Sequence, residues 1–176
     1  MKAPCVATVL VAASLFIGMA GPAVGQSTAG NSPLTTRTTL PNDFGVELGG
    51  HSLLYSFFYQ RMVSPPLLGL EVSIAGLGSA SSSGGGSALV FGSVGGRLYV
   101  VPKNASPFLT AGLVFANAST DSGPFSSGSS STTWGYTGLG FEFRSPAGFV
   151  FRAAAYGIIH GGDYLIWPGL TIGYAF

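Results

Sequence analysis

The sequence predicts an all-β fold, an eight-stranded antiparallel up-and-down transmembrane β-barrel that follows a cleaved signal peptide. Three observations lead to this prediction. The 176 residues are 47% hydrophobic and only 7% charged, whereas soluble domains carry about 25% charged residues. An apolar export signal opens the chain. After it, large apolar side chains alternate with small or polar ones in segments of about ten residues, as in membrane barrels.

Composition also excludes several classes of protein. The formal net charge is +1, so the chain has no basic field for nucleic acid and no acidic tail. Aromatic residues make up 12% of the chain, which is far more than a disordered chain carries. The chain is therefore expected to fold as one domain in an apolar solvent or around an apolar cavity.

Residues 1–25 are predicted to be a signal peptide. A single Lys2 precedes the apolar run 6–20, and Ala23-Val24-Gly25 forms a small-x-small cleavage site. An uncleaved membrane anchor is the alternative, but it needs about 20 apolar residues and this run is shorter. Cys5 is the only cysteine, so the mature chain has no disulfide and no thiolate site.

The rest of the chain divides into a leader and a barrel. Residues 26–42 are rich in Ser, Thr, Pro and Gly and are expected to form a flexible periplasmic leader. Residues 43–176 hold no further apolar stretch of about 20 residues that could form a membrane helix. Because only helices and closed barrels satisfy every backbone group in lipid, an exported chain with so few charges points to a barrel in the outer membrane.

Side-chain alternation predicts which residues face the interior. In the last segment Leu170 and Ile172 fall on one face, and Thr171 and Gly173 fall on the other. Charged residues within the strands fall on the face opposite the large aliphatic side chains. The charged residues predicted to project inward are Glu47, Glu71, Arg97, Glu142 and Arg152.

These five charges are expected to form a polar network that plugs the lumen. The interior of an eight-stranded barrel is just wide enough for its own side chains, and a charge on the lipid face costs about 2–4 kcal/mol at the midplane. The alternative interpretation is a gated path for an ion or solute. We expect Arg97→Ala to destabilise the barrel without creating a conducting pore.

The connections should alternate between short periplasmic turns and longer external loops. An even number of strands then returns both termini to the periplasm. The expected periplasmic turns are 64–66, 103–106 and 145–148, and the expected external loops are 50–52, 79–87, 119–131 and 160–164.

Aromatic residues near the strand ends are predicted to form the girdles that sit at lipid headgroups. Ligand-stacking platforms are the alternative interpretation. The residues concerned are Tyr55, Tyr59, Trp134, Phe143, Tyr164, Trp167 and Tyr174.

The signal peptide, the alternating strands and the terminal Gly173-Tyr174-Ala175-Phe176 resemble the small eight-stranded outer-membrane barrels of Gram-negative bacteria, the class of the OmpA transmembrane domain and OmpX. The resemblance implies an outer-membrane location and contact with outer-membrane lipid and lipopolysaccharide. It also implies that Ile172, Tyr174 and Phe176 are the signal read by the barrel assembly machinery. It leaves oligomeric state and activity open.

No catalytic motif, cofactor site or metal site is recognised, so a non-enzymatic structural or surface-interaction role in the envelope is expected. Lipid A deacylases carry His-x-Ser on one strand. Here His51 and Ser52 are adjacent, so alternation along a strand would place their side chains on opposite faces. His160 is followed by glycine and has no serine two residues later. An outer-membrane lipid-modifying enzyme that uses His51, or His160 with Ser52 or Asp163, remains one alternative. A secreted lipocalin-like binder of apolar ligands is another; it would place aliphatic side chains inside and charges outside.

Overall fold

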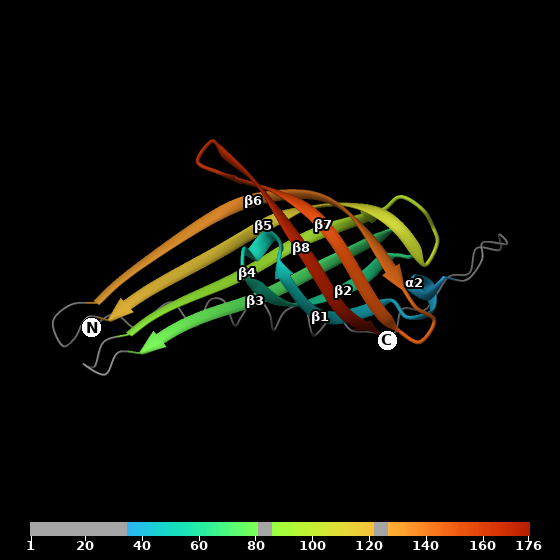
Figure 1. Ribbon diagram of the computed structural model, residues 1–176, viewed down its shortest axis with the longest axis horizontal. Coiled ribbons are helices and arrows are strands. Elements are labelled where there is room, and N and C mark those ends of the chain that lie inside the picture. The colour runs from blue at the N-terminus through green and yellow to red at the C-terminus, as the bar shows by residue number, and fades with distance from the viewer. Residues whose placement is uncertain (1–34, 81–85, 122–126) are drawn as a thin grey trace. The chain divides into compact units, whose positions relative to one another are not determined.

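A computed structural model describes residues 35–80, 86–121 and 127–176, and within them eight antiparallel strands close into a barrel (Figure 1). Each strand pairs with the next in sequence, and β8 returns to pair with β1. The predicted all-β, eight-stranded antiparallel barrel is confirmed, and the predicted signal peptide, residues 1–25, lies outside the described residues. The strands are β1 (Asn42–Gly49), β2 (Tyr55–Ser64), β3 (Leu68–Ala80), β4 (Gly86–Tyr99), β5 (Ala105–Asp121), β6 (Ser127–Arg144), β7 (Phe149–His160) and β8 (Asp163–Ala175).

The two ends of the barrel carry different connections. A short helix, α2 (Thr36–Thr39), lies at the same end as the C-terminus and the β2–β3, β4–β5 and β6–β7 connections (Figure 1). We call this the turn end. The opposite end, called the loop end, carries the 3-10 helix η1 (Gly50–Ser52) and the β7–β8 turn. No helix in the described residues is long and apolar enough to cross a membrane.

The segments 79–87 and 119–131, predicted to be long external loops, are strand at both ends, so the predicted bounds of these loops are wrong; residues 81–85 and 122–126 lie outside the described residues. Strands β3 to β6 are 13 to 18 residues long, whereas β1 has eight. Pairing between β3 and β4 continues to Ala80 and Gly86, and pairing between β5 and β6 continues to Asp121 and Ser127. Side chains on both faces of this extension are largely exposed. A sheet that meets solvent on both faces needs no apolar alternation, which explains why its Ser and Gly residues resemble a loop.

The β7–β8 connection is also shorter than predicted. His160 and Asp163 are paired residues, and only Gly161 and Gly162 lie between them. Both glycines have positive φ angles, 60° and 96°. A two-residue hairpin turn with both φ angles positive matches the right-handed twist of its strands, and glycine adopts those angles without strain.

Hydrocarbon side chains cover the outside of the barrel. The exposed fraction of Leu170 is 51%, while its neighbours along β8, Gly169 and Thr171, are buried; that of Leu139 on β6 is 64%. The buried charged side chains of the strands lie on the opposite, inner face, whereas Arg61 is half-buried and shares the outward-facing positions of β2 with Phe57 and Val63. This distribution is the reverse of the one a lipocalin-like binder requires. Further large apolar side chains on the outer wall are Phe44, Leu48, Phe57, Leu70, Ile74, Leu98, Leu109, Phe141, Phe151 and Ile172.

Trp134 departs from the predicted aromatic girdle. Its exposed fraction is only 8%, and it packs with Phe91, Tyr136 and Ile158 in a cluster of buried side chains inside the barrel. Trp134 was assigned to the girdle from its predicted position near a strand end. That position does not show which face of the strand a side chain is on, and alternation puts Trp134 on the inner face of β6. Of the other predicted girdle residues, Tyr55 and Tyr59 are half-buried and Phe143, Tyr164, Trp167 and Tyr174 are exposed.

Candidate functional site: the barrel interior

The interior holds most of the charge that the sequence contains. The chain has seven basic and six acidic residues, and four arginines and four acidic residues are buried in its described part. All five side chains predicted to project inward are among them. The interior set is Arg37, Asp43, Glu47, Glu71, Arg97, Glu142, Arg144 and Arg152.

Glu142, on β6, is the centre of the ion pairs at the turn end. Its Oε1 accepts hydrogen bonds from Nε of Arg37 at 2.9 Å and from Nε of Arg144 at 2.7 Å. Its Oε2 accepts from Nε of Arg152 and from the hydroxyl of Tyr99, both at 2.5 Å. One carboxylate therefore holds three guanidinium groups, and it can do so because a second carboxylate shares two of them.

That second carboxylate is Asp43, on β1. Nη2 of Arg152 lies 2.5 Å from its Oδ1, and Nη2 of Arg144 pairs with its Oδ2. Arg152 also reaches Oε2 of Glu71 at 3.6 Å, and the same oxygen lies 2.8 Å from Nη1 of Arg97. Charges of both signs thus alternate through the interior, as buried charges require. We call Arg37, Asp43, Glu142, Arg144 and Arg152 the turn-end cluster.

Arg37 enters this cluster from outside the strands. It lies on α2, its guanidinium stacks over the Tyr99 ring at 4.0 Å, and its Nη1 donates to the Lys103 carbonyl. The backbone N–H of Thr36 donates to Oδ1 of Asn104 at 2.7 Å, so α2 is tied to the β4–β5 connection. The side chain of Arg37 is fully buried.

Sequence reasoning missed Arg37, Asp43 and Arg144. Arg37 belongs to the segment 26–42 that was expected to be a flexible leader, and from Thr35 onward that segment is packed against the barrel. Asp43 and Arg144 share faces with Glu47 and Glu142 but lie at strand ends. Charge balance was the available signal, because the predicted set has three acids and two arginines and an enclosed interior disfavours an unpaired charge.

A second polar layer lies toward the loop end and centres on His51, which η1 inserts into the barrel. Nδ1 of His51 is 2.8 Å from Oε2 of Glu47. Nε2 is 2.9 Å from Oγ of Ser93 and 3.1 Å from Oγ of Ser73. The ring stacks on Tyr136 with centroids 4.6 Å apart. We call these five residues, with Tyr156, the His51 layer; the Tyr156 hydroxyl donates to Oε1 of Glu47 at 2.5 Å.

The His51 layer has the chemical order of a hydrolase relay, in which an acid orients a histidine that in turn contacts a hydroxyl. Sequence reasoning considered only Ser52 and found it adjacent to His51. In the structure the hydroxyls come instead from β3 and β4. The alternation argument does not apply to His51, because it lies in a 3-10 helix. Ser52 is itself buried.

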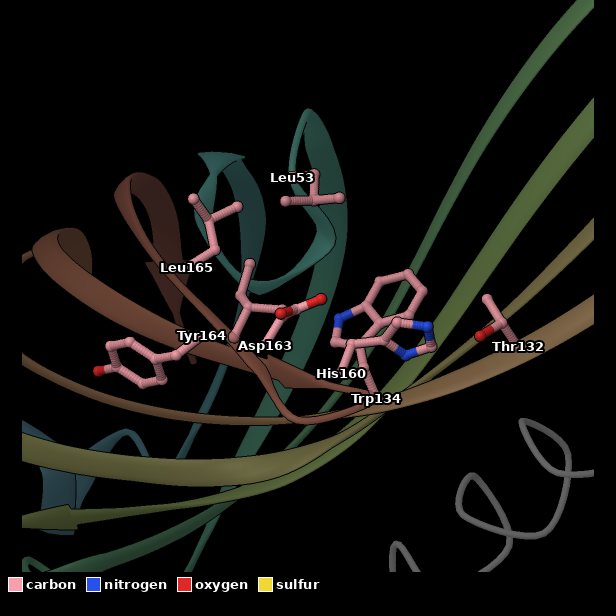
Figure 2. Close-up of a pocket in the computed structure, with 8 residues that line it drawn as sticks. Leu53, Thr132, Trp134, His160, Asp163, Tyr164 and Leu165 are labelled. Carbon is pink, nitrogen blue, oxygen red and sulfur yellow. The ribbon is translucent and has the colours of Figure 1, made fainter.

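Beyond this layer, at the loop end, is a cavity of about 300 Å³. Figure 2 shows Leu53 and Leu165 lining it on one side, with Trp134 and His160 close together on the other. The other lining residues are Thr132, Ile158, Asp163 and Tyr164. The predicted pair His160 and Asp163 thus both lie at this cavity, whereas Ser52 does not line it.

Metal ligation has no support in the described ranges. Within residues 35–80, 86–121 and 127–176 no group of three His, Cys, Asp or Glu side chains is placed to hold a metal ion.

Comparison with known proteins shows the fold and no closer kinship. No protein-family model and no curated protein matches the sequence. The N-terminal β-barrel domain of Pseudomonas aeruginosa OprF is similar with a TM-score of 0.53 and 16% identity, over 77% of this chain and 94% of that one. Ail, the attachment invasion locus protein of Yersinia pestis, in complex with the heparin analogue sucrose octasulfate, has a TM-score of 0.50 and 19% identity, over 77% and 96%. The resemblance to the small eight-stranded outer-membrane barrels is confirmed, and the chain has their fold.

Proposed function

We propose that this chain is a non-enzymatic outer-membrane barrel with a plugged polar lumen and a structural or surface-interaction role in the cell envelope. The separation of side chains by face carries the proposal. Hydrocarbon covers the outer wall, and neutralised charges fill the interior. A wall of this kind is stable against acyl chains and unfavourable in water. The fold shared with OprF and Ail supports the same placement.

Charge pairing supports the plug. Four arginines oppose four acids in the interior, so the filled lumen is formally neutral. A permeating ion would have to separate pairs that are fully buried, and breaking a buried pair costs about 3–5 kcal/mol. The His51 layer adds a second barrier, because its aromatic rings pack across the interior nearer the loop end.

The proposal also assigns contacts to the outer surface. The outer wall would contact outer-membrane lipid and lipopolysaccharide, with the turn end and both termini in the periplasm. Ile172, Tyr174 and Phe176 are each at least half exposed on β8 and at the C-terminus. They would form the signal presented to the barrel assembly machinery.

Conductance and fractionation test the proposal. Protein reconstituted in planar bilayers should give no stable current steps, and Arg97→Ala should lower stability without opening a pore. In cell fractions the protein should be found in the outer membrane and should migrate differently on a gel before and after boiling. Large stable currents would contradict the plug, and a mobility that boiling does not change would contradict the barrel in the membrane.

Ester hydrolysis is a second candidate, favoured by the Glu47, His51 and Ser93 distances of 2.8 and 2.9 Å. It ranks lower because the exposed fractions of His51 and Ser93 are 1% and 8%, which leaves a bulky ester no access to the hydroxyl. Expression of the protein should then remove acyl chains from lipid A. Ser93→Ala should lower the rate of this removal about a hundredfold or more, and Ser79→Ala, on the exposed part of β3, should leave the rate unchanged; these results together would establish the activity. Equal background rates in all three proteins would remove it.

A further inference from the structure

Strand pairing around the barrel is incomplete at the loop end. β8 pairs with β1 only as far as Gly169, so residues 163–168 pair with β7 alone. On the other side, β3 pairs with β2 only as far as Ile74, so residues 75–80 pair with β4 alone. The wall between these two free edges is therefore interrupted. We call this interruption the notch; its floor is η1 and the two residues that follow it.

The floor of the notch is held in a fixed and unusual conformation. Nε1 of Trp167 donates to the Leu53 carbonyl at 2.9 Å, and the Tyr55 hydroxyl donates to the Gly76 carbonyl. Leu53 has a φ of 72° and is the only non-glycine residue with a positive φ in the described chain. Strained backbone of this kind persists where surrounding contacts impose it, and it is concentrated at ligand sites.

The loop-end cavity lies directly behind this floor. Leu53 lines it from the notch side, and Trp134, Ile158 and Leu165 line it from β6, β7 and β8. Figure 2 shows both Leu53 and Leu165 among the side chains that surround it. Ligand pockets begin at about 300 Å³, so a cavity of about 300 Å³ suits a single flexible chain better than a bulky ring system.

Hydrocarbon reaches the notch from the outside. Ile166, on the outer face of β8, is 66% exposed and continues the apolar wall up to the free edge, and Tyr164, which is 63% exposed, joins this wall to the lining of the cavity. The polar lining residues are His160, Asp163 and Thr132; the first two flank the β7–β8 turn, the outermost point of that hairpin. A guest would thus find an apolar interior behind the notch and polar groups toward the loop end.

We propose that the loop-end cavity binds the hydrocarbon chain of a bilayer lipid, which enters sideways through the notch and keeps its polar head near His160 and Asp163. The site is distinct from the plugged lumen, although lateral entry depends on the membrane placement proposed above. The chain would pack against Trp134 and Leu165 without crossing water.

Trp134 can report the guest, because the chain has only two tryptophans. In Trp167→Tyr, which keeps a hydrogen-bond donor on that side chain, Trp134 is the sole tryptophan. The barrel is placed in bilayer nanodiscs, either with phosphatidylcholine brominated on its acyl chains or with a brominated fatty acid added from solution. We expect the brominated phospholipid to quench Trp134. The fatty acid arm tests whether the same chain chemistry is also accepted from water.

A matched pair of substitutions localises the signal. Leu165→Gln places an amide in the cavity, and Ile166→Gln places the same group one residue along the strand, on the lipid face. Leu165→Gln should weaken quenching by about tenfold in effective affinity, whereas Ile166→Gln should leave it within twofold. Equal quenching in the two variants would overturn the site, and quenching by added fatty acid alone would overturn lateral entry.

Folding is checked separately in each variant by the change in gel mobility on boiling. This mobility change is read without any brominated chain. A protein that shows it and resides in the outer membrane but is not quenched would contradict this inference and leave the proposed function intact.

Discussion

At the turn end, all eight strands are paired around the circumference, and the interior is filled by charges that neutralise one another. At the loop end, β3 to β6 continue as an exposed sheet, β8 has a free edge, and the space beside it is an open cavity with a mainly apolar lining. Strands β3 to β8 run through both regions, whereas β1 and β2 stop at the floor of the notch. Strand closure and paired charges therefore stabilise the turn end of this barrel. The loop end does not depend on them, so its strand pairing can be incomplete at the place where a ligand or partner would bind.

The comparison predicts that the largest loss of stability follows from changes in the turn-end cluster. Glu142→Gln removes the charge that holds three buried guanidinium groups, so we expect the free energy of unfolding to fall by about 3–5 kcal/mol. Guanidinium-induced unfolding in lipid vesicles, followed by tryptophan fluorescence, measures it. Asp163→Asn at the exposed loop end should change it by less than about 0.5 kcal/mol. Equal effects of the two substitutions would contradict the comparison.

A smaller loss is expected when α2 is detached. Arg37→Met keeps much of the aliphatic stem but removes the donors to Glu142 and Lys103, which should cost about 1.5–3 kcal/mol. Lys103→Met, an exposed substitution in the adjacent connection, is the control and should be near neutral. Protease cleavage near residue 37 in native vesicles gives a second measurement. Cleavage that is no faster in Arg37→Met than in the control would argue against α2 as a stabilising contact.

The His51 layer should contribute less than the turn-end cluster. His51→Phe keeps a ring that can stack on Tyr136 but removes both nitrogens, while Glu47 keeps the Tyr156 hydroxyl. Ser73 and Ser93 also keep their mutual contact at 2.6 Å. We expect a loss of about 1–2 kcal/mol in the same unfolding assay. A loss as large as that of Glu142→Gln would show that the two layers form one network.

The smallest effect distinguishes backbone strain from packing at the loop end. Gly162→Ala adds a methyl group with nothing within 4 Å but forces alanine to a φ of 96°, so stability should fall by about 1 kcal/mol. Gly76→Ala meets only an ordinary contact at 3.8 Å and should be near neutral. A larger loss of stability in Gly76→Ala than in Gly162→Ala would contradict this expectation and would show that close packing limits side-chain size at the free edge of β3.

Alternation in the sequence predicted the barrel and the inward direction of Glu47, Glu71, Arg97, Glu142 and Arg152 because side-chain period is a local property of a strand. The error for Trp134 came from its predicted position near a strand end, which is typical of a girdle residue, whereas alternation correctly puts its side chain on the inner face of β6. Alternation did not reveal the strand at the ends of the Ser- and Gly-rich segments 79–87 and 119–131, because a sheet exposed on both faces has no burial pattern to detect.

The rest of the interior depends on contacts between distant parts of the chain. Arg37 and Glu142 are 105 positions apart, and His51 meets Ser93 from across the barrel. No local sequence pattern predicts these long-range contacts. The notch and the cavity behind it follow from unequal strand lengths, which the sequence conceals because the ends of β3 to β6 contain few apolar residues.

The attachment of Arg37 has a consequence for the order of assembly. Its partners come from β6 and from the connection between β4 and β5, and the strand that follows it, β1, is also the one that must meet β8 to seal the cylinder. The guanidinium therefore has no complete binding place until β6 and the β4–β5 connection are in position. Helix α2 therefore ties the chain just before β1 to β6 and to the β4–β5 connection, which lie away from the β1–β8 seam in the strand order of the barrel.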